Sequence, residues 1–335
     1  MNMEYDIDNE EAKANSIKNY YIKKDLIHVG DMVAKMTFIM LALELFLTMI
    51  GELVLNIINK NITIANPETY ELIVMCIASL TANILAYFWL MERTNIPSTS
   101  MRSSNEKQGK YMLKWICIIF TLQAVGGLCY EGIQLVSSFA GFTWGGFGMN
   151  MPAFSHREFI PYFIWVCLIA PITEEMVYRG VLLKVLSPYG SKTAILISAV
   201  LFGAIHGNLQ QFPIAFLLGL LFGFISIKTG TIFYTIILHM FNNVYSVASG
   251  LLSVIIKNSM TSTVIIWGIT IIVGLIGIFL IYKEREEYIN LSSGKYDDFF
   301  ISIKGGAIKC FFKSFWIRIL MSLLIVICIS TVQKI

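Results

Sequence analysis

Long apolar segments, separated by short polar stretches, dominate this chain of 335 residues. Its residues are 56% hydrophobic and only 14% charged, whereas a soluble domain carries about 25% charged residues. A helix of about 20 residues crosses a bilayer. The sequence therefore predicts an all-α fold, a polytopic bundle of transmembrane helices. Nine segments of roughly spanning length occur, at 36–58, 71–91, 113–138, 158–186, 192–207, 212–228, 231–256, 262–282 and 314–332.

Two of these segments, 192–207 and 212–228, are short for a membrane crossing, so eight spans stay open as the alternative to nine. Basic residues concentrate in alternate loops, as in the run from Lys283 to Lys313. Because Lys and Arg are retained on the cytosolic side, we expect a multi-pass plasma-membrane protein with its amino terminus inside and its carboxyl terminus outside. A net charge of +3 without a basic patch gives no sign of nucleic-acid binding.

The sequence divides into parts by hydropathy and motif content. Residues 1–12 are acidic and are predicted to be disordered. Segment 141–156, rich in glycine and aromatic residues, is predicted to be a loop on the outer face or a re-entrant piece. Six cysteines are scattered without the spacing of metal sites. The predicted parts are a cytosolic tail at 1–30, three membrane helices at 31–140, a motif-bearing core at 157–250, and two helices at 262–335 with a cytosolic loop at 283–313.

The first motif, PITEEMVYRG, begins at Pro171 in the fourth apolar segment. Pro171 is predicted to break or kink the helix, with Thr173 capping a restarted one. Glu175 and Arg179 are four residues apart, so they lie on one helix face and are predicted to form an ion pair. Glu174 is left as the freer carboxylate, and desolvation makes such a group a stronger base. A salt-bridge cluster at the membrane interface is the structural alternative.

Two histidine motifs follow in later apolar segments. Phe202 precedes His206 by four residues, so ring packing can fix the imidazole on one helix face. His239 and Asn243 also share a face, and both can donate hydrogen bonds to a developing oxyanion. A satisfied packing histidine and interhelical hydrogen bonding are the structural alternatives. Ionisable groups are costly in hydrocarbon, and we expect the three motifs to meet in one cavity.

The order E-E-x-x-x-R, F-x-x-x-H and H-x-x-x-N resembles the CPBP family of intramembrane endopeptidases, which includes CAAX proteases and the bacteriocin-processing and self-immunity (Abi) proteins. The resemblance covers about residues 158–250. It implies a catalytic core in which a water molecule attacks a peptide carbonyl. Six residues carry the implied reaction: Glu174 and His206 deprotonate the water, His239 and Asn243 stabilise the oxyanion, and Glu175 and Arg179 organise the carboxylate end.

The resemblance leaves the cofactor and the function open at several points. No cofactor is favoured, but the family has been described both as metalloproteases and as metal-independent enzymes, so zinc on Glu174, His206 and His239 stays an alternative. The expected substrate is a membrane-associated peptide or a lipidated protein, surrounded by membrane lipid. A catalytically silent immunity or scaffold protein that binds another membrane enzyme is the alternative function. A transporter relay through Glu44, Glu52 and Glu174 is a third.

Overall fold

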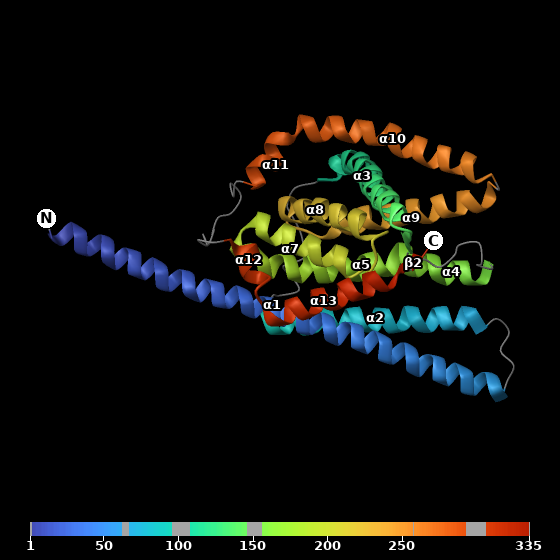
Figure 1. Cartoon of the computed structure of the whole chain (residues 1–335), viewed down its shortest axis with the longest axis horizontal. Helices are drawn as coiled ribbons and strands as arrows, with labels where there is room; N and C mark the ends of the chain where they lie inside the picture. The colour runs from blue at the N-terminus through green and yellow to red at the C-terminus, as the bar shows by residue number, and fades with distance from the viewer. Residues whose placement is uncertain are drawn as a thin grey trace.

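The computed structural model describes residues 2–61, 67–95, 108–145, 156–256, 258–292 and 306–334, so parts of the predicted loops 141–156 and 283–313 lie outside it. Figure 1 shows a bundle of long helices that run roughly across the view, with α10 (Ser259–Lys283) at one edge and α1 (Asn2–Asn61) at the other. Among the described residues, six helices are long and apolar enough to cross a membrane. The protein is therefore a helical, multi-pass membrane protein. These spans are Ser16–Asn59, Thr69–Thr94, Met112–Phe139, Glu158–Tyr189, Phe212–Thr229 and Met260–Lys283.

Each of the nine predicted apolar segments overlaps a described helix. The remaining helices outside the motif segment are α2 (Pro67–Thr94), η2 (Gln108–Tyr111), α3 (Met112–Phe139), α7 (Ser191–Ala204), α8 (Phe212–Thr229), α9 (Phe233–Ile255), α11 (Arg285–Ser292), α12 (Ala307–Phe311) and α13 (Phe315–Ser330). Three of the predicted spans are not among these six: α7 and α13 are too short, and α9 is long enough but carries the polar residues His239, Asn242 and Asn243. The exact number of crossings stays a prediction.

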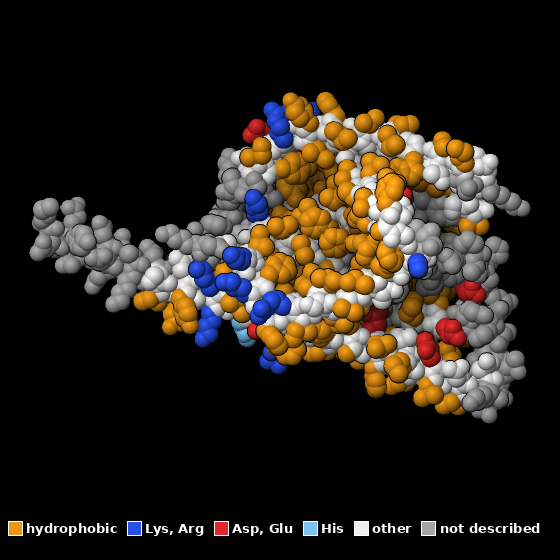
Figure 2. Space-filling view, in the orientation of Figure 1, with side chains coloured by type: hydrophobic (Ala, Val, Ile, Leu, Met, Phe, Trp, Pro, Cys, Tyr) orange, Lys and Arg blue, Asp and Glu red, His pale blue; other side chains and the backbone are white. Residues whose placement is uncertain are grey.

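The helix α1 is a single element of 60 residues that contains both the predicted tail and the first predicted span. Its amino-terminal part projects away from the bundle (Figure 1). The predicted disorder of residues 1–12 is therefore wrong for 2–12, where Glu, Ala and Lys are good helix formers. Figure 2 shows Lys and Arg side chains gathered at the end of the bundle from which α1 projects, with hydrophobic side chains over much of the rest of this face.

Two short strands join the segment after α3 to the last described residues of the chain. β1 (Phe142–Trp144) pairs antiparallel with β2 (Val332–Lys334), and the side-chain amide of Gln134 in α3 hydrogen-bonds the backbone of β1. The predicted all-α class is thus correct apart from this small sheet. The predicted loop at 141–156 begins with a strand because the backbone of β2 supplies the hydrogen-bond partners.

Close helix packing fixes the elements that carry the site. A Cβ on Gly219 of α8 would lie only 2.9 Å from the Cα of Ala199 in α7, so glycine permits the approach of these two helices. Helix α10 packs along α3, where the hydroxyl of Thr121 donates to the carbonyl oxygen of Gly274 at 2.7 Å. The helices that precede and follow the motif segment in the chain are therefore held together by contacts close to the backbone, α3 with α10 and α7 with α8.

Candidate active site

The motif segment forms one continuous helix that contains two wider, π-helical turns. Its successive parts are α4 (His156–Ile164), η4 (Trp165–Ile169), α5 (Ala170–Glu175), η5 (Met176–Leu182), α6 (Leu183–Leu186) and η6 (Ser187–Tyr189). Thr173 does not cap a restarted helix, because its hydroxyl donates to the carbonyl oxygens of Ile169 and Ala170 at 3.2 and 3.1 Å. Of the two outcomes predicted for Pro171, the break is wrong, since the wide turn before it accommodates the proline ring, and the kink stays a prediction.

Pro171 leaves one carbonyl of the first π-helical turn without a helical donor. The N–H of Ala170 donates to the carbonyl oxygen of Trp165, five residues earlier. In that register the carbonyl of Val166 would pair with residue 171, but proline has no N–H. The amide of Asn243 takes this place, with Nδ2 2.7 Å from the Val166 oxygen. The wide turn, a feature frequent at functional sites, thus links the motif helix to α9.

Glu175 and Arg179 form a fully buried ion pair, as their spacing predicted. Arg179 Nη1 lies 2.8 Å from Glu175 Oε1, and neither side chain is exposed to solvent. The guanidinium carbon lies 4.3 Å from the ring centre of Phe202 and 5.5 Å from that of Phe222. The carboxylate and the aromatic faces together stabilise a positive charge that would be costly to bury alone.

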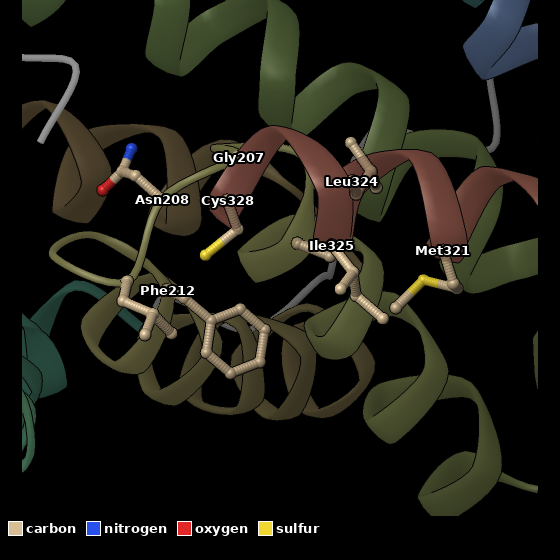
Figure 3. A pocket seen from close by; sticks show the side chains of 9 residues that line it. Gly207, Asn208, Phe212, Met321, Leu324, Ile325 and Cys328 are labelled. Atoms are coloured by element: carbon tan, nitrogen blue, oxygen red, sulfur yellow. The ribbon is translucent and has the colours of Figure 1, made fainter. Parts of the chain in front are cut away.

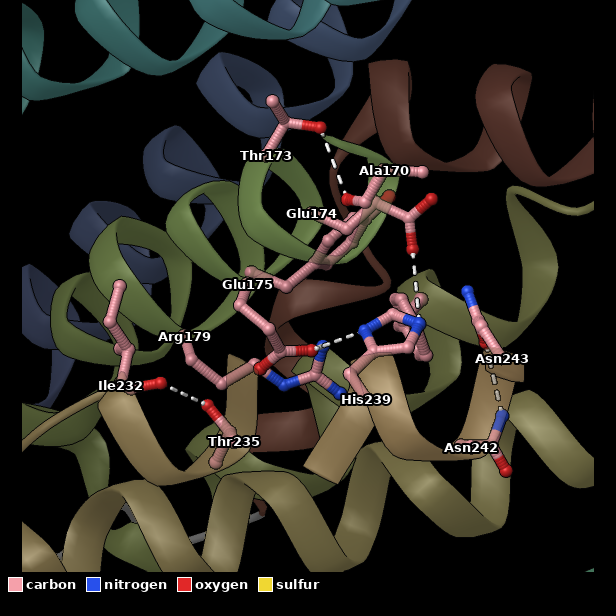
Figure 4. A network of polar contacts seen from close by, with 12 residues as sticks. Ala170, Thr173, Glu174, Glu175, Arg179, Ile232, Thr235, His239, Asn242 and Asn243 are labelled. Carbon is pink, nitrogen blue, oxygen red and sulfur yellow. Dashed lines mark hydrogen bonds and ion pairs between the residues drawn. The ribbon is translucent and has the colours of Figure 1, made fainter. Parts of the chain in front are cut away.

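His239 extends this ion pair to α9, as Figure 4 shows. Its Nδ1 lies 3.0 Å from Glu175 Oε1, and its Nε2 lies 3.8 Å from Glu174 Oε2. An ionised carboxylate only accepts hydrogen bonds, so Nδ1–H of His239 is the donor to Glu175. The neutral ring therefore carries its lone pair on Nε2, toward Glu174. The side chain of Glu174 is 27% exposed, so the two neighbouring glutamates have opposite surroundings.

His206 lies in a turn rather than in the helix predicted at 192–207. Helix α7 ends at Ala204, and Gly207 has a φ of 65°, a conformation that favours glycine and ends helices. His206 Nδ1 lies 2.8 Å from the carbonyl oxygen of Phe202, so this nitrogen carries the proton in the neutral ring. The Phe202 ring packs on the imidazole with ring centres 5.4 Å apart, as predicted. Both site histidines are therefore held with Nε2 as the unprotonated nitrogen of the neutral ring.

Asn208 builds the turn that carries His206 and was missed in the sequence. Its Nδ2 donates to the carbonyl oxygen of His206 at 2.8 Å and to Gln211 Oε1 at 2.7 Å. Its Oδ1 accepts from the backbone N–H of Gln211 at 2.9 Å. The dipeptide Gly207-Asn208 is the signal that could have identified this turn, because both residues favour turn conformations.

Four of the six predicted site residues line one cavity of about 380 Å³. The four are Glu174, His206, His239 and Asn243. Glu175 bonds to His239 and Arg179 bonds to Glu175, but neither residue lines the cavity. The other lining residues, which the sequence did not identify, are Tyr162, Trp165, Val166, Ala170, Gln211, Ser246, Val247 and Gly250. Ser246 and Gly250 follow Asn243 by three and seven residues, so helical periodicity could have found them.

A second cavity, of about 230 Å³, lies beside Gly207 and Asn208 of the turn that carries His206 (Figure 3). Its walls are mainly apolar and come from the turn, from Ala204 and Phe212 in the helices beside it, and from α13, which contributes Met321, Leu324 and Cys328. A Cβ on Gly207 would lie 3.0 Å from Cγ2 of Ile327 in α13. Helix α13 therefore packs closely against the turn and supports the position of His206.

The zinc alternative does not fit this geometry. Over the part of the chain that the structure describes, no three His, Cys, Asp or Glu side chains converge closely enough to hold a metal ion. Zinc needs three protein ligands close around one point in a catalytic site, and Glu174, His206 and His239 do not meet that requirement. The chemistry proposed below therefore uses only the groups of the protein and water.

Comparison with known proteins agrees with the motifs. Residues 156–245 match the family model described as Type II CAAX prenyl endopeptidase Rce1-like. No curated protein and no solved structure matches the chain. The matched residues contain all six predicted site residues, from Glu174 to Asn243, and the family is one of peptidases. Over residues 156–245 the chain is therefore similar to the Rce1-like type II CAAX prenyl endopeptidases, in agreement with its three motifs.

Proposed function

We propose that this protein is an intramembrane endopeptidase that hydrolyses a peptide bond in a membrane-associated peptide or a lipidated protein. The observation that carries this proposal is one cavity that collects a carboxylate, two imidazoles and a side-chain amide within a helical membrane protein. The family match over residues 156–245 supports the same class of reaction. A cavity of low dielectric strengthens each polar contact made inside it.

Glu174 and His206 are proposed to activate the water. Arg179 pairs with Glu175 rather than with Glu174, so the Glu174 carboxylate is available to accept a proton. The neutral His206 ring accepts a second hydrogen bond from the water at Nε2. The water oxygen bonds to the peptide carbonyl carbon as its proton passes to Glu174, and that proton later passes to the leaving amine as the C–N bond breaks.

Asn243 and His239 are proposed to stabilise the oxyanion. One N–H of Asn243 bonds to the Val166 carbonyl, which leaves the second for the oxyanion. His239 can donate from Nε2 when its ring is doubly protonated, because its Nδ1–H already bonds to Glu175. The proposed task of Glu175 and Arg179 is therefore to hold His239, rather than the catalytic carboxylate.

We also propose nine crossings with a cytosolic amino terminus. The strand β1 follows the third predicted span and β2 follows the ninth, and the pairing of the two strands fits the six crossings between them. The Lys and Arg side chains at the end from which α1 projects favour the cytosolic side for that end. The division into a tail at 1–30, helices at 31–140, a core at 157–250 and a final part at 262–335 is proposed with this topology.

The function is tested by comparing the small membrane peptides of cells that carry wild-type protein or Glu174→Gln. Without the base we expect the uncleaved precursor to accumulate, at an unchanged membrane level of the protein. The matched control is Glu52→Gln, which changes an exposed glutamate of α1 and should process as wild type does. A catalytically silent scaffold predicts identical peptides in all three strains, and that outcome would contradict the proposal.

A further inference from the structure

A chain of side-chain amides connects α3 to the candidate site. Gln123 Nε2 lies 2.6 Å from Asn242 Oδ1, Asn242 Nδ2 lies 3.1 Å from Asn243 Oδ1, and Asn243 Nδ2 lies 2.7 Å from the Val166 oxygen. Gln123 belongs to α3 and lies outside the residues 156–245 that match the peptidase family. A residue from outside the family segment thus reaches, through Asn242, an amide that lines the cavity.

The Val166 carbonyl, at one end of this series of amides, fixes the direction of every hydrogen bond in the series. A backbone carbonyl only accepts, so the Asn243 atom beside Val166 is its amide nitrogen. The Asn243 oxygen then needs a donor, which is the amide nitrogen of Asn242. The Asn242 oxygen needs a donor in turn, which is the amide nitrogen of Gln123. Neither asparagine can turn its amide over without setting two oxygens or two N–H groups against each other.

Burial prevents water from replacing these bonds freely. Asn242 is only 7% exposed, and an unpaired amide in such a place carries a desolvation cost. At the far end, Pro171 supplies no N–H to the Val166 carbonyl, so that acceptor stays available to Asn243. With Gln123 in place, only one arrangement of the amides forms every hydrogen bond of the series from Gln123 to the Val166 carbonyl.

We propose that Gln123 is a positioning residue for the peptidase reaction: it fixes, through Asn242, the orientation of the Asn243 amide whose second N–H serves the oxyanion. This inference rests on the proposed function. Gln123 does not contact the reacting atoms. Its loss would instead weaken the hydrogen bond from Asn243 to the oxyanion, and that bond is made only in the transition state. Such a loss lowers kcat and leaves KM unchanged.

The test uses purified full-length protein in detergent and, as the probe, an internally quenched prenylated peptide with a CAAX terminus. Gln123→Met removes the donor at similar length, and we expect kcat to fall roughly fivefold, the effect of one hydrogen bond. In Gln123→Glu an ionised carboxylate cannot donate but a neutral acid can, so kcat relative to wild type should rise as the pH falls. The matched control is Gln134→Met on the same helix, because Gln134 bonds to β1; its kcat should equal that of wild type.

A double variant separates positioning from a purely structural effect. In an Asn243→Ala background the amide that Gln123 orients is absent, so adding Gln123→Met should cause no further loss of kcat. An equal further loss in that background would overturn the inference, as would a wild-type kcat in Gln123→Met alone. Failure of the proposed function has a different signature, because wild type and Glu174→Gln would then cleave the probe equally, and the inference would fall with it.

Discussion

At the residue scale, the site depends on two neighbouring glutamates with opposite surroundings. Glu175 has no exposed side-chain surface, whereas Glu174 is 27% exposed. The spacing of four residues predicted the bond between Glu175 and Arg179, because both partners share one helix face. It could not predict the bond from His239 to Glu175, which joins residues 64 positions apart and depends on how two helices pack.

Removing Glu175 should destabilise the protein strongly, because Arg179 would be left as a buried charge without its counter-charge. We expect Glu175→Ala to lose about 3–5 kcal/mol of stability, measured as a lower thermal midpoint in detergent. The double variant Glu175→Leu with Arg179→Met should regain most of that stability but stay inactive, because His239 has lost its acceptor. A single variant as stable as wild type would contradict the buried ion pair.

Asn243→Asp tests the oxyanion role at nearly constant shape. A carboxylate has no N–H for the Val166 carbonyl or for the oxyanion, so we expect kcat to fall by on the order of 10²–10³. The control is Asn258→Asp, because Asn258 caps α10 through its side-chain oxygen and aspartate caps helices equally well. Equal kcat values for the two variants, with the quenched peptide as the probe, would argue against a role for Asn243.

At the scale of elements, two π-helical turns and the turn after α7 decide where the site residues lie. Sequence periodicity predicted the helices, but it does not distinguish α from π register, because the same apolar residues suit both. For that reason Pro171 was expected to break or kink the helix rather than to follow a π-helical turn. The sequence also predicted a helix end at residue 207, three residues beyond the observed end of α7 at Ala204. The apolar run continues to Ile205, and the left-handed conformation of Gly207 is not visible in the apolar pattern.

Pro171→Ala tests whether the wide turn has a chemical purpose. The substitution restores a backbone N–H at position 171, which competes with Asn243 for the carbonyl of Val166. We expect the thermal midpoint to hold or rise, because proline is unfavourable inside a helix. The kcat should fall roughly fivefold, the effect of one hydrogen bond. A wild-type kcat at an unchanged or higher midpoint would show that the free carbonyl does not matter.

At the scale of the whole molecule, the strong signals in the sequence were the long apolar runs and the three motifs. The apolar runs predicted the helical membrane fold correctly, because a run of about 20 apolar residues is typical of a membrane-spanning helix. The three motifs pointed to the family whose model matches residues 156–245. The pairing of β1 with β2 was not predictable, since three-residue strands are too short to show alternation. Gln123 was missed for a related reason: a single amide in an apolar helix has no spacing partner to mark it.

The proposed topology predicts which residues face the outside. With a cytosolic amino terminus, Thr143→Cys and Gln333→Cys should react with a membrane-impermeant maleimide added to intact cells, because paired strands lie on the same side. Lys18→Cys should react only after the cells are opened. The parent protein serves as the background, since it carries free cysteines of its own. Labelling of Lys18→Cys in intact cells would show that the amino terminus lies outside, opposite to the proposed orientation.

In the proposed mechanism, Glu174 takes a proton from a water molecule in the cavity it shares with His206. The most direct test compares kcat for purified wild type, Glu174→Gln and the control Glu52→Gln on the quenched prenylated peptide. Loss of a general base should lower kcat by on the order of 10²–10⁴ in Glu174→Gln, and Glu52→Gln should match wild type. Cleavage by wild type and by Glu174→Gln at the same rate would show that Glu174 is not the general base.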